Sequence, residues 1–219
     1  MDDRKESEEV QEEPIIEPII NGPLRVKNLK DFRNSRGEAI EVKPVMLLCR
    51  CGKSNRSPFC DGMHLKIDFR SDKAADRVPD KVDTYVGNEI TIHDNQGVCA
   101  HVRYCVDNSP AVFNDNRKPW IEPDAADAEE TAATIRMCPS GALSYTKDGV
   151  LYKDLDRKPS ITIFKNGPYC VVGGIELKDP GGCKPESKEH YTLCRCGASK
   201  NKPFCDGAHS TVNFQDDKN

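Results

Sequence analysis

Four side chains of metal-binding type recur at one spacing in two parts of the chain. The pattern is Cys-x-Cys-x8-Cys-x3-His, and its copies are Cys49, Cys51, Cys60, His64 and Cys194, Cys196, Cys205, His209. Thiolates and imidazoles are ligands for zinc and iron. A Cys-x-Cys pair can present two thiolates to one ion, and a Cys and a His four residues apart lie on one face of a helical turn. The spacing therefore suits two metal ions per copy, as in a [2Fe–2S] cluster.

A single zinc ion is the alternative occupant of each Cys3His set, because zinc takes four nitrogen or sulfur ligands. Structural zinc sites usually separate their first two ligands by two to four residues, whereas one residue separates the first two cysteines here. The spacing favours an iron–sulfur cluster but leaves zinc open.

Each copy also carries groups that can support an anionic cluster. Asp61 and Asp206 follow the third cysteine and are predicted to cap a single helical turn that starts there. The positive end of that turn would face the cluster. Glycines beside the cysteines would let the backbone approach the sulfur atoms.

The two copies belong to a longer internal repeat. Asn21-Gly22-Pro23 recurs as Asn166-Gly167-Pro168 and Phe69 recurs as Phe214, always offset by 145 residues with no net gap. A repeated unit of this size indicates two copies of one module that flank a different segment.

The fold class predicted from these patterns is α+β, built from small, β-rich modules stapled by metal. Strands are expected in copy one at 15–26, interrupted by Pro18 and the Asn-Gly-Pro turn, and at 41–48. The corresponding strands of copy two are expected at 160–164 and 169–172. In the middle segment, we expect a strand at 85–93, a helix at 124–137 capped by Asp124 and closed by Pro139, and a hairpin of 143–145 with 150–152.

Changes in composition and the repeat set the expected domain boundaries. These are a disordered acidic tail at 1–13, module one at 14–70, a linker at 71–82, a central domain at 83–155 and module two at 156–217.

The motif Cys-x-Cys-Gly-x-Ser-x3-Pro-Phe-Cys-Asp-Gly-x-His, read at 49–64 and 194–209, resembles the CDGSH iron–sulfur family. The resemblance implies a [2Fe–2S] cluster in each copy, with the first two cysteines on one iron and the third cysteine and the histidine on the other. Family members with one module pair as homodimers, so the two modules here are expected to form a pseudo-twofold pair within a monomer. Copy one departs at Met63, where the family usually has a small residue, which indicates different packing rather than lost ligation.

A histidine ligand has two physical consequences. Neutral imidazole donates less charge than thiolate, so the reduction potential rises. Imidazole can also be protonated off the metal, so both clusters are expected to be lost faster below about pH 6 than at pH 8.

Three further cysteines, Cys99, Cys105 and Cys138, lie in the middle segment, the last directly before a proline. Bacterial ferredoxins place ligands as Cys-x2-Cys-x2-Cys with a distant Cys-Pro. Cys99 and Cys105 occupy the first and third positions, and Val102 replaces the second. Residues 85–147 therefore resemble a divergent, single-cluster ferredoxin domain that lacks one ligand.

Three interpretations of this central site are open. Three thiolates suit a [3Fe–4S] cluster, which is preferred. Alternatively, His101 completes a [4Fe–4S] cluster, or the cysteines are buried thiols of a vestigial domain.

Other residues of these types have simpler explanations. Cys170 is expected to be a small buried hydrophobe, and Cys183 lies in a loop that could approach the second cluster. His93 and His190 are expected on the surface or hydrogen-bonded, and Trp120 is expected to anchor the central core.

Composition restricts the class of protein further. The 219 residues are 37% hydrophobic and 31% charged, which is little material for one large core and favours a metal staple. Eleven cysteines, no recognisable signal segment and no apolar run of about 20 residues indicate a reducing, cytoplasmic protein without a membrane span. The net charge is −4, of which residues 1–13 contribute −5, so no basic field for nucleic acid exists.

The expected function is electron transfer or redox sensing, and not catalysis, because no phosphate-binding loop or activated nucleophile is present. The expected partners are redox proteins that donate or accept electrons, or apo iron–sulfur proteins. The alternatives are cluster storage and delivery, a zinc-stapled interaction module, and a subunit of an oxidoreductase.

Overall fold

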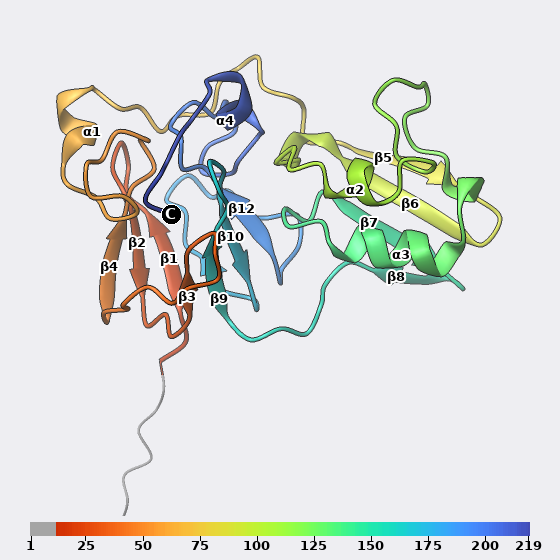
Figure 1. Cartoon of the computed structure of the whole chain (residues 1–219), viewed down its shortest axis with the longest axis horizontal. Helices are drawn as coiled ribbons and strands as arrows, with labels where there is room; N and C mark the ends of the chain where they lie inside the picture. Colours follow the sequence, from red (N-terminus) through yellow and green to blue (C-terminus); the bar gives the residue numbers. More distant parts are fainter. Residues whose placement is uncertain (1–11) are drawn as a thin grey trace, which may run out of the picture.

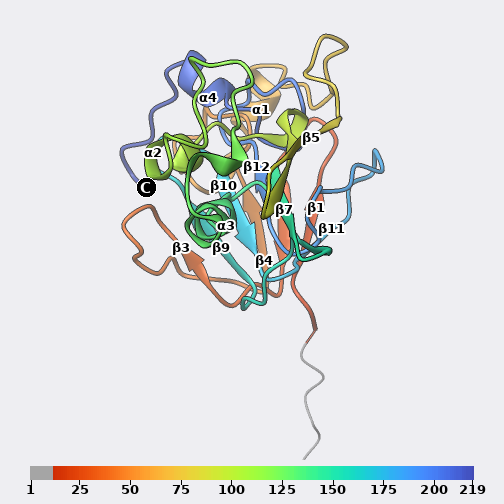
Figure 2. The ribbon, with the colours of Figure 1, turned by 90° about the vertical axis from the view of Figure 1, so that its right-hand side faces the viewer.

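The computed structural model of the chain describes residues 12–219, and most of the expected acidic tail (1–13) lies outside this range. Three four-stranded sheets make up the fold. The β9–β10–β12 sheet of the second module lies between the first module and the central domain (Figure 1). In Figure 2 the central domain lies in front of the other two sheets.

The first module contains an antiparallel sheet of β1 (Ile15–Pro18), β2 (Leu24–Lys27) and β4 (Val45–Leu48). The Asn-Gly-Pro turn joins the first two strands, and Gly22 N donates to Ile19 O at 2.9 Å. The second module repeats the arrangement with β9 (Ser160–Ile163), β10 (Tyr169–Val172) and β12 (Tyr191–Leu193). The predicted repeat of strands is confirmed.

Each module also contributes a two-residue edge strand to the sheet of the other module. β3 (Phe32–Arg33) pairs in parallel with β9, and β11 (Glu176–Leu177) pairs in parallel with β1. Phe32 lies opposite Ile161, and Leu177 lies opposite Ile16, so the two pairings are related by the repeat offset. These short edge strands were not predicted.

A single apolar core therefore joins the two modules. Leu24 and Val26 from the first sheet and Ile161 and Val171 from the second are at most 1% exposed and belong to one cluster. Burial of this shared surface makes each module depend on the other for its stability.

The central domain is an antiparallel sheet in sequence order: β5 (Val82–Val86), β6 (Ile90–Asn95), β7 (Leu143–Lys147) and β8 (Val150–Tyr152). The helix α3 (Ala128–Arg136) packs on β7 and contacts the shorter α2 (Tyr104–Asn108). Two 3-10 turns, η1 (Gln96–Val98) and η2 (Pro123–Ala125), complete it. The predicted hairpin of β7 and β8 is confirmed.

Several predicted boundaries were wrong. The strand expected at 85–93 is a hairpin, because the chain turns at 87–89 between β5 and β6. Asp127, not Asp124, caps α3 and accepts from Glu129 N and Glu130 N. Asp124 instead accepts from Asn88 N at 2.8 Å, which ties η2 to the hairpin.

The single-turn helices α1 (Met63–Lys66) and α4 (Ala208–Thr211) begin two residues after the aspartates from which they were expected to start. Within residues 12–219, no helix combines the length and apolarity needed to cross a membrane.

Candidate metal centres

The first Cys3His set lies where β4 ends and α1 begins. Cys49 Sγ and Cys51 Sγ lie 3.5 Å apart, and Cys60 Sγ lies 3.3 Å from His64 Nδ1. The four side chains therefore form two pairs. The imidazole turns Nδ1 toward Cys60, but the expected shared helical face is wrong, because α1 begins only after the left-handed Gly62, which separates the cysteine from the helix.

The second set has the same geometry at the end of β12 and the start of α4. Cys194 Sγ and Cys196 Sγ are 3.8 Å apart, and Cys205 Sγ lies 3.5 Å from His209 Nδ1. Among residues 12–219, no three His, Cys, Asp or Glu side chains converge on the position of one ion.

The two aspartates of the motif brace the ligand loops. Asp61 accepts from Asn55 N at 2.8 Å and from Met63 N at 3.0 Å, and these bonds lower the pKa of its carboxyl group. Asp206 accepts from Lys200 N at 2.7 Å and from Ala208 N at 3.1 Å. Each carboxylate thus ties the Cys-x-Cys loop to the start of the helix.

The donors around the sulfur atoms suit a cluster that carries negative charge. Gly62 N donates to Cys60 Sγ and Gly207 N to Cys205 Sγ, both at 3.5 Å, and Ala198 N donates to Cys196 Sγ at 3.4 Å. Such N–H groups stabilise thiolate ligands and tune iron–sulfur clusters. The donor set and its pairing therefore fit a cluster of two irons in each module.

The two thiols of each Cys-x-Cys pair lie within hydrogen-bond distance of each other. In the first pair the Cys51 thiol hydrogen-bonds to Cys49, which lowers the pKa of Cys49. Burial raises the pKa of Cys60 and of Cys205. Metal binding must displace these protons, so loading of the sites is expected to release them.

The modules contact each other at the ligand loops. A Cβ on Gly52 would lie 2.4 Å from Cys196 O, and one on Gly197 would lie 2.6 Å from Cys51 O. Tyr169 donates its hydroxyl hydrogen to Cys49 O at 2.8 Å. Each site is therefore enclosed in part by the other module.

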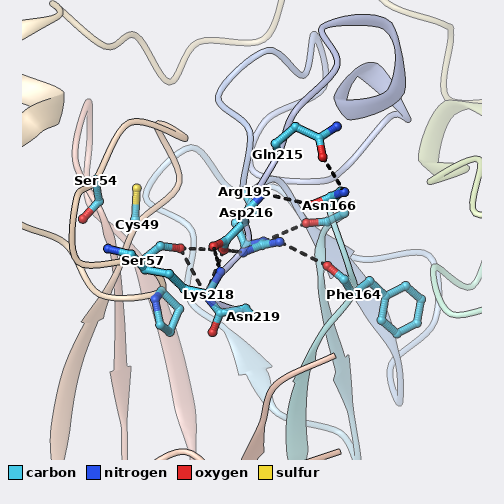
Figure 3. A network of polar contacts seen from close by, with 12 residues as sticks. Cys49, Ser54, Ser57, Phe164, Asn166, Arg195, Gln215, Asp216, Lys218 and Asn219 are labelled. Carbon is cyan, nitrogen blue, oxygen red and sulfur yellow. Dashed lines mark hydrogen bonds and ion pairs between the residues drawn. The ribbon is translucent and has the colours of Figure 1, made fainter. Parts of the chain in front are cut away.

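The C-terminal segment of module two covers the loop of the first site. Asp216 accepts from the Ser57 hydroxyl at 2.7 Å (Figure 3). Lys218 Nζ donates to Asn55 O at 2.5 Å. The sequence pattern had no signal for these contacts.

The three central cysteines come together. Cys99, Cys105 and Cys138 line one small cavity of about 30 Å³, and the first two also line an adjoining cavity of about 350 Å³. Burial, followed by the nearby Cys138, raises the pKa of Cys105 to about 11. The three thiols line one cavity without meeting at a single ion position, which suits a cluster of several irons better than one metal ion.

His101 lines the same cavity, but its ring also packs against the second module. Its backbone is left-handed, with φ of 51°, and a Cβ on Gly207 would lie 2.6 Å from His101 Cδ2. Gly207 lies between the ligands Cys205 and His209. The histidine thus connects the central site with the second Cys3His site.

Asp94 is a buried group of the central site that the sequence analysis missed. It is 1% exposed, lines the cavity of the three cysteines and accepts from Trp120 Nε1 at 3.2 Å. Burial raises its pKa to about 6. The alternation of Ile90, Ile92 and Asp94 along one face of β6 is the signal that would have identified it.

The remaining cysteines and histidines lie mostly as expected. Cys170 is 8% exposed within β10, and Cys183 packs against the shared core of the two modules. His190 is 3% exposed, and its Nδ1 lies 2.9 Å from Glu189 Oε2. Trp120 packs against the central core.

Comparison with known families agrees with this architecture. The family described as "Iron-binding zinc finger CDGSH type" matches residues 21–65 and 166–210, and "Divergent 4Fe-4S mono-cluster" matches residues 85–148. The chain therefore belongs to the CDGSH iron-binding family, with two such domains flanking a divergent 4Fe-4S domain.

The similar proteins found are small and have no described function. The "Uncharacterized protein YjdI" of Escherichia coli strain K12 and that of Escherichia coli O157:H7 are each 43% identical to this chain over 61 residues. The alignment covers 28% of this chain and 80% of each relative. No solved structure matches the chain.

Proposed function

We propose that the protein is an electron carrier with three iron–sulfur clusters, in which the central cluster exchanges electrons with the second Cys3His site. The observation that carries this proposal is the packing of His101, from the central cavity, against Gly207 of the second site. Tyr104 of the central domain also packs against Phe164 of module two, with ring centroids 6.0 Å apart and ring planes tilted by 41°. Close packing between redox sites is what electron transfer needs.

Each Cys3His set would hold one [2Fe–2S] cluster, which supplies one-electron chemistry when bound. The Cys-x-Cys pair would bind one iron, and the Cys and His pair would bind the other. The reciprocal exchange of β3 and β11 supports a pseudo-twofold pair of modules within one monomer. The backbone N–H groups at Cys60 and Cys205 would stabilise the ligand sulfurs.

The central cysteines would hold a third cluster. The description of the matching family favours four irons, whereas three thiolates alone suit [3Fe–4S]. A fourth iron would need a ligand other than thiolate, and His101 and Asp94 both line the cavity. A ferredoxin-like role of this domain follows from either cluster.

The thiols themselves support a reducing, cytoplasmic setting. All eleven cysteines of the chain are free. With most of them assigned as ligands, we infer a carrier that exchanges electrons with other redox proteins and not an enzyme with a substrate of its own.

Cluster delivery to an apo-protein is the second candidate. His64 is half-buried on α1, a four-residue helix without a single buried side chain. A ligand on such a weakly held element could be released. Mixing the loaded protein with an apo-ferredoxin separates the two functions, because a carrier would keep its clusters over hours.

The function is tested by counting iron and acid-labile sulfide after anaerobic purification and recording EPR spectra of the oxidised and reduced protein. Three clusters require seven or eight irons per chain, with eight indicating a central [4Fe–4S]. A [3Fe–4S] centre would be paramagnetic when oxidised, and the [2Fe–2S] centres when reduced. A count of four irons per chain would mean that the central site holds no cluster. A colourless protein that contains zinc and no iron would overturn the proposal.

A further inference from the structure

The two Cys3His sites have closely matched ligands, yet the charges buried beside them differ. Arg50 and Arg195 occupy equivalent positions between the first two cysteines of each motif. Arg50 Nε donates to Gly22 O at 2.6 Å, and Arg195 Nε donates to Gly167 O at 2.8 Å. Both arginines are at most 3% exposed, so their charges are poorly screened by water.

Each guanidinium lies near the site of the other module. Arg195 lines a cavity together with Cys49 of the first site. Arg50 lines a cavity together with Pro203, and Pro203 O accepts a hydrogen bond from Cys194 N of the second site at 2.9 Å. Arginine stays protonated in proteins, so both side chains carry a full positive charge.

Among residues 12–219, only one of the two arginines has a carboxylate partner in contact. Arg195 Nη1 forms an ion pair with Asp216, which is 8% exposed (Figure 3). The repeat places Ser71 at the position of Asp216. The two positions are equivalent in structure as well, because Ser71 N donates to Asn21 Oδ1 and Asp216 N to Asn166 Oδ1, both at 2.9 Å.

The wider surroundings keep this difference. The charged residues lining the cavity of Arg50 are Lys73, Lys202, Asp72 and Asp179, and those lining the cavity of Arg195 are Lys218, Asp216 and Asp217. With the arginine included in each case, the side chains that line the cavity of Arg50 carry one net positive charge, and those that line the cavity of Arg195 carry none. Asp179 is half-buried near Arg50 without a hydrogen bond to it among the described contacts.

We propose that this asymmetry sets the order of reduction, so that the second Cys3His site accepts an electron before the first. The inference rests on the proposed function, since both sites must hold clusters. One-electron reduction converts one ferric ion to ferrous and adds one negative charge to the site. An uncompensated positive charge nearby stabilises that charge and raises the reduction potential. Asp216 cancels this effect at the first site, whereas Ser71 leaves it intact at the second.

The test is a potentiometric titration of the loaded, full-length protein with dithionite as electron donor, followed by EPR. The wild type should show two [2Fe–2S] signals with different potentials. His64→Cys and His209→Cys assign them, because an added thiolate lowers the potential of its own cluster only. The higher potential should belong to the second site.

Two opposite substitutions then test the cause. Asp216→Asn keeps hydrogen-bonding groups at this position and removes the charge, so the potential of the first site should rise toward that of the second. Ser71→Asp provides Arg50 with a partner, so the potential of the second site should fall. Ser71→Asp adds an ion pair, which keeps the proposal testable if Asp216→Asn does not fold.

Asp76→Asn is the matched control. Asp76 is an exposed carboxylate that pairs with Lys200 in the loop of the second site, so water screens its charge and both potentials should stay in place. Equal potentials in the wild type, or loaded variants whose potentials do not move, would overturn the inference. A protein without iron and sulfide would instead overturn the proposed function.

Discussion

Tyr169, in β10 of the second module, donates its hydroxyl hydrogen to the backbone carbonyl of Cys49, the first ligand of the first site. The two residues are 120 positions apart. The same hydroxyl lies 3.1 Å from Pro58 O, just before the third ligand. A buried side chain of one module therefore fixes the ligand loop of the other.

Tyr169→Phe removes these bonds and leaves two buried carbonyl groups without this donor. We expect a loss of about 1–3 kcal/mol in the free energy of unfolding and faster cluster loss from the first site. Denaturant unfolding and the decay of visible absorption measure the two effects.

The control is Tyr191→Phe. Tyr191 is equally buried, but its hydroxyl donates to Ile175 O within its own module at 2.8 Å. The Tyr191→Phe substitution should lower the free energy of unfolding by a similar amount, without selective cluster loss at the first site. Selective loss in both variants would contradict the role assigned to Tyr169.

Gly52→Ala should disrupt the contact between the two ligand loops. The added Cβ would meet Cys196 O at 2.4 Å, and the residue has φ of 72°. We expect the free energy of unfolding to fall by about 1–3 kcal/mol from overpacking, in addition to about 1–2 kcal/mol from the left-handed backbone.

Gly37→Ala separates the cost of overpacking from the cost of the left-handed backbone, because Gly37 has φ of 80° and nothing within 4 Å of its Cβ position. The thermal midpoint should fall less in Gly37→Ala than in Gly52→Ala. Equal shifts would mean that the loops do not press on each other.

Gly207→Ala should affect the central cluster as well as the second site. The new methyl group would displace the ring of His101, whose Cδ2 lies 2.6 Å from its position. We expect altered EPR line shape or lower iron content at the central site.

Gly62→Ala is the matched control in module one. Gly62 has φ of 87°, close to the 81° of Gly207, but nothing lies within 4 Å of its Cβ position. It should leave the central signal unchanged. A central signal that responds to neither substitution would argue against coupling through His101.

Acid should remove the clusters through their histidine ligands. Only neutral imidazole binds iron, and burial lowers the pKa of His209 below its usual value near 6.5. Because the lowered pKa moves protonation below the usual value, cluster loss should accelerate as the pH falls below about 6. Visible absorption at pH 5.5 and pH 8 measures the rates, and His209→Cys should slow the acid-driven loss from the second site. Equal rates at both pH values would refute this expectation.

The fold itself should also lose stability in acid, through His190. Burial lowers its pKa, although Glu189 opposes the shift; Arg157 and Asp154 are the other charged groups near it. Because the unfolded chain takes up this proton at higher pH than the folded one, stability is full above about pH 6.5 and declines below it. The thermal midpoint should drop less between pH 7.5 and pH 5.5 in His190→Gln than in the wild type, and an equal drop would exclude His190 as a cause.

The repeat and most strands were predictable because they depend on short-range patterns. Cys60 and His64 are four residues apart and their side chains meet, although α1 begins only after Gly62 and a left-handed turn at that glycine, not a shared helix, brings them together. The two strands around the Asn-Gly-Pro turn alternate buried and exposed residues, which is a local signal. Asp124 was a wrong cap because sequence alone could not choose between it and Asp127 at the start of α3.

By itself, the sequence determined which residues could bind metal, how often the module occurs, and that the central site has three thiols. The tertiary structure decided how these parts meet. The exchanged strands β3 and β11 are two residues long and have no periodicity to detect. The hydrogen bonds from Tyr169 to Cys49 and from Ser57 to Asp216 join positions more than 100 residues apart, and only the packing of one core between the modules brings them into contact.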